Sequence, residues 1–166
     1  MPTPENEAKK DRLNQLSHRV IGLCIEVHRE LGPGLLESAY EEALAYELTH
    51  AGLRYERQCD IPLTYKGVSL DCGYRLDFVV EGELIIELKS IHAFQPIHQA
   101  QLLTYLKLQR RSLGLLLNFN VPVMKEGVKR VACGSLFQDE KSSGLGLLSF
   151  ATLLVASAAA WISSRA

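Results

Sequence analysis

The sequence predicts a single α/β domain in which helices cover a mixed sheet. Three observations favour this class: an amphipathic helical pattern opens the chain, a strand-rich stretch follows, and a further helix separates that stretch from two later strands. The length of 166 residues suits one domain with a complete hydrophobic core.

Two helices are expected before the strands. Apolar residues recur at helical spacing through 11–31, which predicts the first helix. Gly32-Pro33-Gly34 should end it, because proline cannot continue the hydrogen-bond ladder and glycine accepts a left-handed cap. The second helix is expected to run from about Leu35 to Gly52. Its inward-facing residues should be Leu36, Ala43, Leu44 and Leu48.

The stretch that follows is rich in Tyr, Val, Ile and Leu. Lys66-Gly67 and Glu81-Gly82 interrupt it as hairpin signals, so strands are expected near 54–65, 68–80 and 83–89. A third helix over 96–110 opens with a proline. The residues that this helix offers for burial are Ile97, Ala100, Leu103 and Leu106. Strands near 114–119 and 128–132 complete the predicted sheet.

Composition excludes several functional classes. Eighteen basic and nineteen acidic residues leave a net charge of −1, which excludes binding driven by a large overall positive charge. The four cysteines form no Cys-x-x-Cys pair, which excludes zinc-ribbon and thioredoxin-like sites. The polar N-terminus carries no secretory signal, which predicts a cytoplasmic protein.

The end of the chain differs from the rest. The main domain is expected to cover 1–138, with a joint at 139–144 and an added apolar C-terminal helix at 145–162. At about 1.5 Å per residue such a helix spans roughly 27 Å, close to the thickness of a bilayer core. Small and polar residues lower its hydrophobicity, so a membrane anchor and a packing or homodimerisation helix stay open as alternatives.

Charged residues stand inside two apolar strands. Glu87 and Lys89 lie two residues apart and share one face of their strand, while Asp77 lies in the strand before it. Carboxylate oxygens are the ligands that Mg²⁺ prefers, and a neighbouring lysine can contact a phosphate or assist the attacking water. A structural ion pair at the end of a strand is the alternative interpretation.

These residues resemble a known enzyme pattern. Asp77 followed by Glu87-Leu88-Lys89 is similar to the core motif of the PD-(D/E)XK nuclease superfamily. Gln101 and Tyr105 match the Gln-x-x-x-Tyr motif of its RecB-like branch. The segment 34–40 reads Gly-x-x-Glu-x-x-Tyr, the signature of the GxxExxY family within this superfamily. The resemblance covers about residues 13–135 and implies a restriction-endonuclease-like fold.

The resemblance also implies a function. It implies a nuclease that hydrolyses phosphodiester bonds in nucleic acid, with DNA favoured and Mg²⁺ or Mn²⁺ as cofactor. The catalytic residues that it implies are Glu37, Asp77, Glu87, Lys89, Gln101 and Tyr105. Asp77, Glu87 and the Leu88 carbonyl would hold the metal ion. The near-neutral charge favours an alternative, a non-catalytic module of the same fold that binds nucleic acid or a protein partner.

Side chains alternate between the two faces of a strand, and this alternation restricts the geometry of the site. A two-residue loop at Glu81-Gly82 would place Asp77 and Glu87 on opposite faces of the sheet. A site that uses both acids therefore requires Val80 to lie opposite Leu84, with a three-residue loop or a bulge between the strands.

Overall fold

The computed structural model describes residues 3–70 and 74–137. Its helices are α1 (Pro4–Leu31), α2 (Glu37–His50) and α3 (Pro96–Leu108), with a 3₁₀ turn η1 at Met124–Gly127. Its strands are β1 (Tyr55–Asp60), β2 (Leu63–Tyr65), β3 (Val68–Leu70), β4 (Arg75–Val80), β5 (Leu84–Lys89), β6 (Leu113–Asn118) and β7 (Val128–Ala132). This element order confirms the predicted α/β class.

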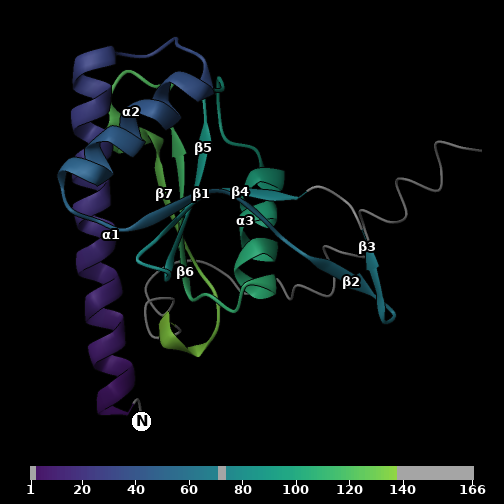
Figure 1. Cartoon of the computed structure of the whole chain (residues 1–166). Helices are drawn as coiled ribbons and strands as arrows, with labels where there is room; N and C mark the ends of the chain where they lie inside the picture. The colour runs from purple at the N-terminus through teal and green to yellow at the C-terminus, as the bar shows by residue number, and fades with distance from the viewer. Residues whose placement is uncertain (1–2, 71–73, 138–166) are drawn as a thin grey trace, which may run out of the picture.

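Five strands form the main sheet in the order β1-β4-β5-β6-β7 (Figure 1). Neighbouring strands are antiparallel except β5 and β6, which are parallel. A parallel pair requires a crossover connection, and α3 supplies it. The strands β2 and β3 form a separate two-stranded sheet that projects away from the main sheet (Figure 1). The sheet is therefore mixed, as the sequence predicts.

Helices cover both faces of the main sheet. On one face, α1 and α2 pack over the strands in the larger core cluster, which includes Val20, Leu44 and Phe78. On the other face, α3 packs over β6 and β7 through a smaller cluster that includes Leu102 and Leu116. The central strands β5 and β6 are thus buried on both sides, as is usual where helices cover a sheet, whereas β1, β4 and β7 keep exposed residues.

The predicted strands 54–65 and 68–80 are each divided in two. Because Pro62 has no N–H to donate to a ladder, β1 ends at Asp60 and β2 begins at Leu63. Lys66-Gly67 forms the predicted hairpin turn, but this turn joins the short strands β2 and β3. The strand β1 pairs instead with β4. The two strand lengths predicted from the sequence are therefore wrong.

Two helix starts differ from the prediction. Helix α1 begins at Pro4 rather than near residue 11, because the Thr3 hydroxyl caps it by accepting the Asn6 N–H at 3.3 Å. Helix α2 begins at Glu37, which makes Leu36 its N-cap residue. The Leu36 backbone is extended, so its side chain leaves the helix face and is 78% exposed. The predicted burial of Leu36 is wrong.

Helix α3 is rotated relative to the prediction. Leu106 is buried and Leu103 half-buried, as expected, but Ala100 is exposed and Ile97 is 63% exposed. The residues that face the sheet are Leu102, Tyr105 and Leu106. The helix ends at Leu108, before the expected residue 110. The predicted burial of Ile97 and Ala100 is wrong because the sheet occupies only one side of this helix.

The connection from β4 to β5 has the length that a site with both acids requires. Val80 pairs with Leu84, so the loop holds the three residues Glu81, Gly82 and Glu83. Glu81 and Gly82 both have positive φ, and the Glu81 carboxylate accepts hydrogen bonds from the Arg54 side chain at 2.8 and 3.1 Å. The three-residue register required by the sequence argument is confirmed.

The C-terminal predictions concern residues outside the described part of the chain. The joint at 139–144, the apolar helix at 145–162 and its membrane or homodimer roles all lie there. Within residues 3–70 and 74–137, no helix combines the length and the apolar character needed to cross a bilayer.

Gly127 lies where η1 meets the end of β6. A Cβ atom at this position would lie 2.0 Å from the Asn118 carbonyl oxygen and 2.9 Å from a methyl group of Val121. We expect Gly127→Ala to lower the free energy of unfolding by about 1–3 kcal/mol, because backbone must move to admit the methyl group. Urea denaturation of the full chain measures this change.

Gly22 provides the matched control for this prediction. It lies inside α1, and no atom outside its own helix backbone and chain neighbours comes within 4 Å of the place that a methyl group would take. Gly22→Ala should therefore raise the stability by up to about 1 kcal/mol through helix propensity. A Gly127→Ala protein as stable as the Gly22→Ala protein would contradict the close packing of η1 on β6.

Candidate active site

The main sheet opens between β4 and β5. Their pairing ends at Phe78 and Ile86, while β4 continues beside β1 and β5 continues beside β6. In this opening the Asp77 carboxylate takes the place of a strand carbonyl, and its Oδ2 accepts the Leu88 N–H at 2.7 Å. The sheet thus places an acid side chain between two strands, where the ladder would otherwise leave a buried donor without a partner.

Glu87 and Lys89 lie at the same end of β5. Their side chains are only 5% and 15% exposed, and Lys89 Nζ donates to Glu87 Oε1 at 2.7 Å. Lys89 Nζ also donates to the Leu88 carbonyl oxygen at 2.8 Å. Glu87 Oε2 is buried and accepts no hydrogen bond within the described residues. A buried carboxylate oxygen without a donor is costly, so this atom favours a further cationic partner.

Burial and mutual repulsion both oppose the ionisation of the acids. Burial raises the pKa of Glu87 to about 7, and the nearby charge of Asp77 contributes to this increase while Lys89 opposes it. Burial also raises the pKa of Asp77, although the Leu88 N–H stabilises its charged form. A cation bound between two such carboxyl groups stabilises their charged forms, because its charge offsets both the burial and the mutual repulsion.

Lys89 keeps its proton in this environment. Burial disfavours its charge, but the charge and hydrogen bond of Glu87, together with the charges of Glu37 and Asp77, raise its pKa above the ordinary value. The ammonium therefore contributes a positive charge and a proton donor at neutral pH rather than a base.

Glu37 approaches the acids from the first turn of α2. Ser90, directly after β5, donates its hydroxyl to the Leu35 carbonyl oxygen at 2.6 Å, and its backbone hydrogen-bonds the Glu37 carboxylate. Burial raises the pKa of Glu37, Lys89 lowers it and Asp77 raises it again. The Glu37 carboxyl group therefore lies within electrostatic reach of the residues on β4 and β5.

Tyr40, the tyrosine of the Gly-x-x-Glu-x-x-Tyr segment, is a structural residue. It is fully buried, and its ring stacks on Phe119 with centroids 4.5 Å apart. Its hydroxyl donates to the Gly32 carbonyl at 2.7 Å and accepts the Leu35 N–H at 3.1 Å. These bonds fix the loop before α2 and so position Glu37.

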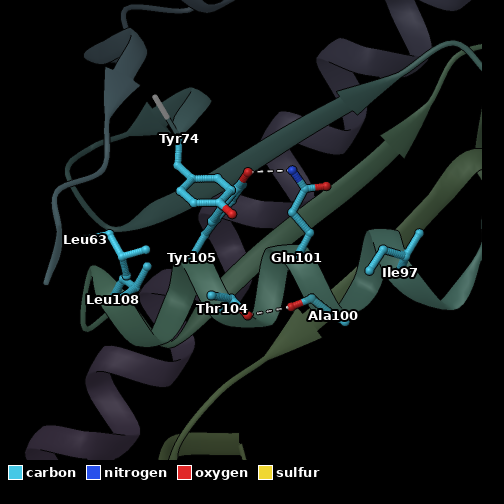
Figure 2. Close-up of a pocket in the computed structure, with 8 residues that line it drawn as sticks. All are labelled: Leu63, Tyr74, Ile97, Ala100, Gln101, Thr104, Tyr105 and Leu108. Atoms are coloured by element: carbon cyan, nitrogen blue, oxygen red, sulfur yellow. Dashed lines mark hydrogen bonds between the residues drawn. The ribbon is translucent and has the colours of Figure 1, made fainter. Parts of the chain in front are cut away.

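Gln101 and Tyr105 lie on α3, one turn apart. Gln101 Nε2 donates to the Tyr105 hydroxyl at 2.5 Å, the upper dashed contact in Figure 2. Burial raises the pKa of Tyr105, the Gln101 hydrogen bond lowers it, and the charges of Glu87 and Lys89 also act on it. The Tyr105 hydroxyl is thus electrostatically coupled to the acids on the sheet.

The sequence-predicted residues therefore gather around the opening between β4 and β5. They are Glu37, Asp77, Glu87, Leu88, Lys89, Gln101 and Tyr105, and their catalytic roles stay predictions. Within the described ranges, no three Asp, Glu, His or Cys side chains converge into a metal-binding group. A cation would therefore rest on the two strand carboxylates, a backbone carbonyl oxygen and water.

Three further residues support the site and were not predicted from the sequence. Gln58 lies opposite Asp77 with a φ of 50° and donates to its Oδ1 at 3.5 Å. Ser90 links the end of β5 to the start of α2. Buried Asn118 accepts the Ile91 N–H at 3.0 Å and donates to the Ile91 carbonyl at 2.8 Å, which fixes the loop after β5. Only Asn118 gives a sequence signal, as an amide that ends an apolar strand.

Comparison with known proteins identifies the family. The model of the PD-(D/E)XK nuclease superfamily matches residues 14–131, which include the main sheet except for the last residue of β7, and the residues around its opening. Neither the curated proteins nor the solved structures give a match. Because the family model covers most of the chain, this protein belongs to the PD-(D/E)XK nuclease superfamily.

Proposed function

We propose that this protein is a nuclease that uses Mg²⁺ or Mn²⁺ to hydrolyse phosphodiester bonds in nucleic acid, with DNA as the favoured substrate. One observation carries the proposal. Asp77 and buried Glu87 flank the opening between β4 and β5 beside Lys89, and Glu87 Oε2 has no hydrogen-bond donor in the described residues. Superfamily membership supports the same function.

The residues present fit a divalent cation. Asp77, Glu87 and the Leu88 carbonyl oxygen would hold it, because together they offer hard oxygen ligands and an unmatched negative charge. A bound cation of this kind polarises a phosphoryl oxygen and makes its bound water a better nucleophile. Two carboxylates leave positions open for water and phosphate oxygens.

The protein side chains would position the substrate. Lys89 holds its proton at Nζ and would contribute positive charge to the phosphate as negative charge develops there. The Tyr105 hydroxyl accepts the Gln101 amide, which leaves its own proton free to donate to a phosphate oxygen. Glu37 would act through its charge on Lys89 and Asp77.

Within the superfamily, we assign the chain to the GxxExxY family with a RecB-like Gln-x-x-x-Tyr motif. Tyr40 supports this assignment because its hydrogen bonds fix the loop that presents Glu37. The Gln101–Tyr105 contact supports it because Gln101 holds the Tyr105 hydroxyl, on which the charges of Glu87 and Lys89 act.

Asp77→Asn tests the cation site. The Asn carbonyl can still accept the Leu88 N–H, so the fold is preserved while one charge is lost. At ten times its dissociation constant, Mg²⁺ or Mn²⁺ should raise the melting temperature of the unaltered chain by roughly 5 °C. Asp77→Asn should abolish this rise. Asp60→Asn is the matched control, because Asp60 is 80% exposed on neighbouring β1 and should leave the rise intact.

Cleavage of labelled single-stranded and duplex DNA and RNA, with Mg²⁺ or with EDTA, tests turnover. Cation-dependent cleavage supports the nuclease. A cation-induced rise in melting temperature without cleavage of any substrate would instead favour the non-catalytic module. Equal stabilisation of the Asp77→Asn and unaltered proteins would refute the site itself.

A further inference from the structure

A cavity of about 350 Å³ lies beside α3, between this helix and the chain at Leu63 and Tyr74 (Figure 2). Its volume is within the range of pockets that bind small molecules. Helix α3 forms one wall, and residues at the start of β2 and just before β4 form the other. The lining residues are Leu63, Tyr74, Ile97, Ala100, Gln101, Thr104, Tyr105 and Leu108.

The chemistry of this lining favours an uncharged aromatic ligand. Among the described residues, no charged side chain lines the cavity, whereas two tyrosine rings do. The Tyr74 and Tyr105 rings meet edge to face, with centroids 6.3 Å apart and an interplanar angle of 63°. Tyr74 is 45% exposed and Ile97 63% exposed, so both present apolar surface to an incoming group. Aromatic side chains of this kind form stacking platforms for flat rings.

The cavity adjoins the candidate active site through one side chain. The Tyr105 ring lines the cavity, while its hydroxyl bonds Gln101 and is acted on by the charges of Glu87 and Lys89. A ligand whose charged part lies near Lys89 can therefore place an adjoining uncharged part in the cavity. A nucleotide has this division between a charged phosphate and a neutral, flat base.

We propose that this cavity is a subsite for one unpaired nucleobase beside the phosphate that is cleaved. The inference rests on the proposed nuclease function and adds its substrate class. In a duplex, the faces of each base are stacked and its edges are paired, so only an unpaired base can enter. The substrate is therefore a single strand, or a duplex whose end or target nucleotide is splayed.

The lining also predicts how the base is recognised. Gln101 donates to Tyr105, and the Thr104 hydroxyl donates to the Ala100 carbonyl at 3.0 Å (Figure 2). One N–H of Gln101 and the Thr104 hydroxyl hydrogen are thus used within α3, whereas the tyrosine rings and Ile97 offer apolar contact. Recognition is therefore by stacking, which tolerates any base.

Fluorescence anisotropy of two labelled probes tests the subsite. The probes are a short oligothymidylate and an abasic oligonucleotide of the same length and charge. The full-length chain carrying Asp77→Asn is used in EDTA, because it lacks one carboxylate of the cation site and does not turn over the probe. The oligothymidylate should bind about tenfold more tightly than the abasic probe, which is the effect of stacking one base.

Variants of Tyr74 and Ile97 test whether the preference for the base-bearing probe arises in this cavity. Tyr74→Ala should remove the preference for the base-bearing probe, and Tyr74→Phe should retain it because the ring remains. Ile97→Asp should also remove it, since it places a charge at the edge of the cavity without burying it. Tyr46→Ala is the matched control, because Tyr46 is 60% exposed on α2 and does not line the cavity. Unchanged melting temperatures show that each variant is folded.

Each outcome separates the two proposals. Equal binding of both probes, or a Tyr74→Ala preference equal to that of the parent chain, would overturn the nucleobase subsite and leave the nuclease proposal standing. A base preference in a protein without cation-dependent cleavage would keep the cavity as a base-binding site but overturn the nuclease, and with it the cleavage of the adjoining phosphate. Absence of binding to either probe would overturn the subsite, whereas the nuclease proposal is decided by cleavage with Mg²⁺.

Discussion

Lys89→Ala is expected to lower the rate of phosphodiester cleavage by a factor of about 100 to 10,000. The variant lacks the ammonium that lies 2.7 Å from Glu87 and 2.8 Å from the Leu88 carbonyl, the only protonated side chain that the hydrogen bonds of the described residues place on these oxygens. A positioned charge and proton donor at the reacting phosphate typically accounts for an effect of this size. Single-turnover cleavage of labelled DNA with saturating Mg²⁺ measures it.

The Lys89→Ala experiment separates catalysis from cation binding. Asp77, Glu87 and the Leu88 carbonyl remain in the variant, so Mg²⁺ should still raise its melting temperature. The loss of a neighbouring positive charge should make this rise at least as large as in the unaltered chain. Lys125→Ala, at an exposed position in η1, should leave cleavage unchanged. Cleavage by Lys89→Ala at the unaltered rate would remove this lysine from the mechanism.

Glu87→Gln should abolish cleavage while making the cation-free protein more stable at alkaline pH. Burial raises the pKa of Glu87 from 4.5 to about 7, so the folded chain binds this proton more tightly than the unfolded chain does. The tighter binding of this proton therefore stabilises the folded chain below pH 4.5, and this stabilisation is lost as the pH rises through 7. At pH 8 the charged, buried carboxylate lowers the free energy of unfolding by on the order of 3 kcal/mol.

The glutamine in Glu87→Gln resembles the protonated carboxyl group and does not titrate. In EDTA the variant should match the unaltered chain near pH 4.5 and exceed it at pH 8, as measured by urea denaturation at both values. Glu56→Gln, at an exposed position in β1, is the control and should show no such pH-dependent difference. A Glu87→Gln protein less stable than the unaltered chain at pH 8 would mean that the ion pair with Lys89 is mainly structural.

The stability cost and the proposed activity arise from the same atoms. In the described residues, Glu87 Oε2 has no donor, and Asp77 repels Glu87 across the opening between β4 and β5. A fold selected only for stability would replace such a carboxylate with an apolar or amide side chain. The presence of both acids in buried strands therefore favours a site that is completed by a cation.

The sequence alone determined which charged side chains share the opening. A Glu and a Lys two residues apart in an apolar strand must share a face, and Asp77 in the preceding strand can join them only with a three-residue connection or a bulge between the strands. The structure confirms that register at Val80 and Leu84. These inferences succeeded because strand alternation is a local property that side-chain spacing reveals directly.

Only the tertiary structure decided how the strands part and what surrounds them. Pairing of β4 with β5 stops at Phe78 and Ile86, while each strand continues beside its other neighbour, and Asp77 bonds Leu88 in the gap. Tyr74 and Tyr105 meet edge to face where they line a cavity, although Tyr74 lies just before β4 and Tyr105 lies on α3. Ile97, which its helical position marks for burial, is exposed at that cavity. Periodicity shows that a residue can be buried, but the packing partner decides whether it is, and that partner is fixed by long-range strand order.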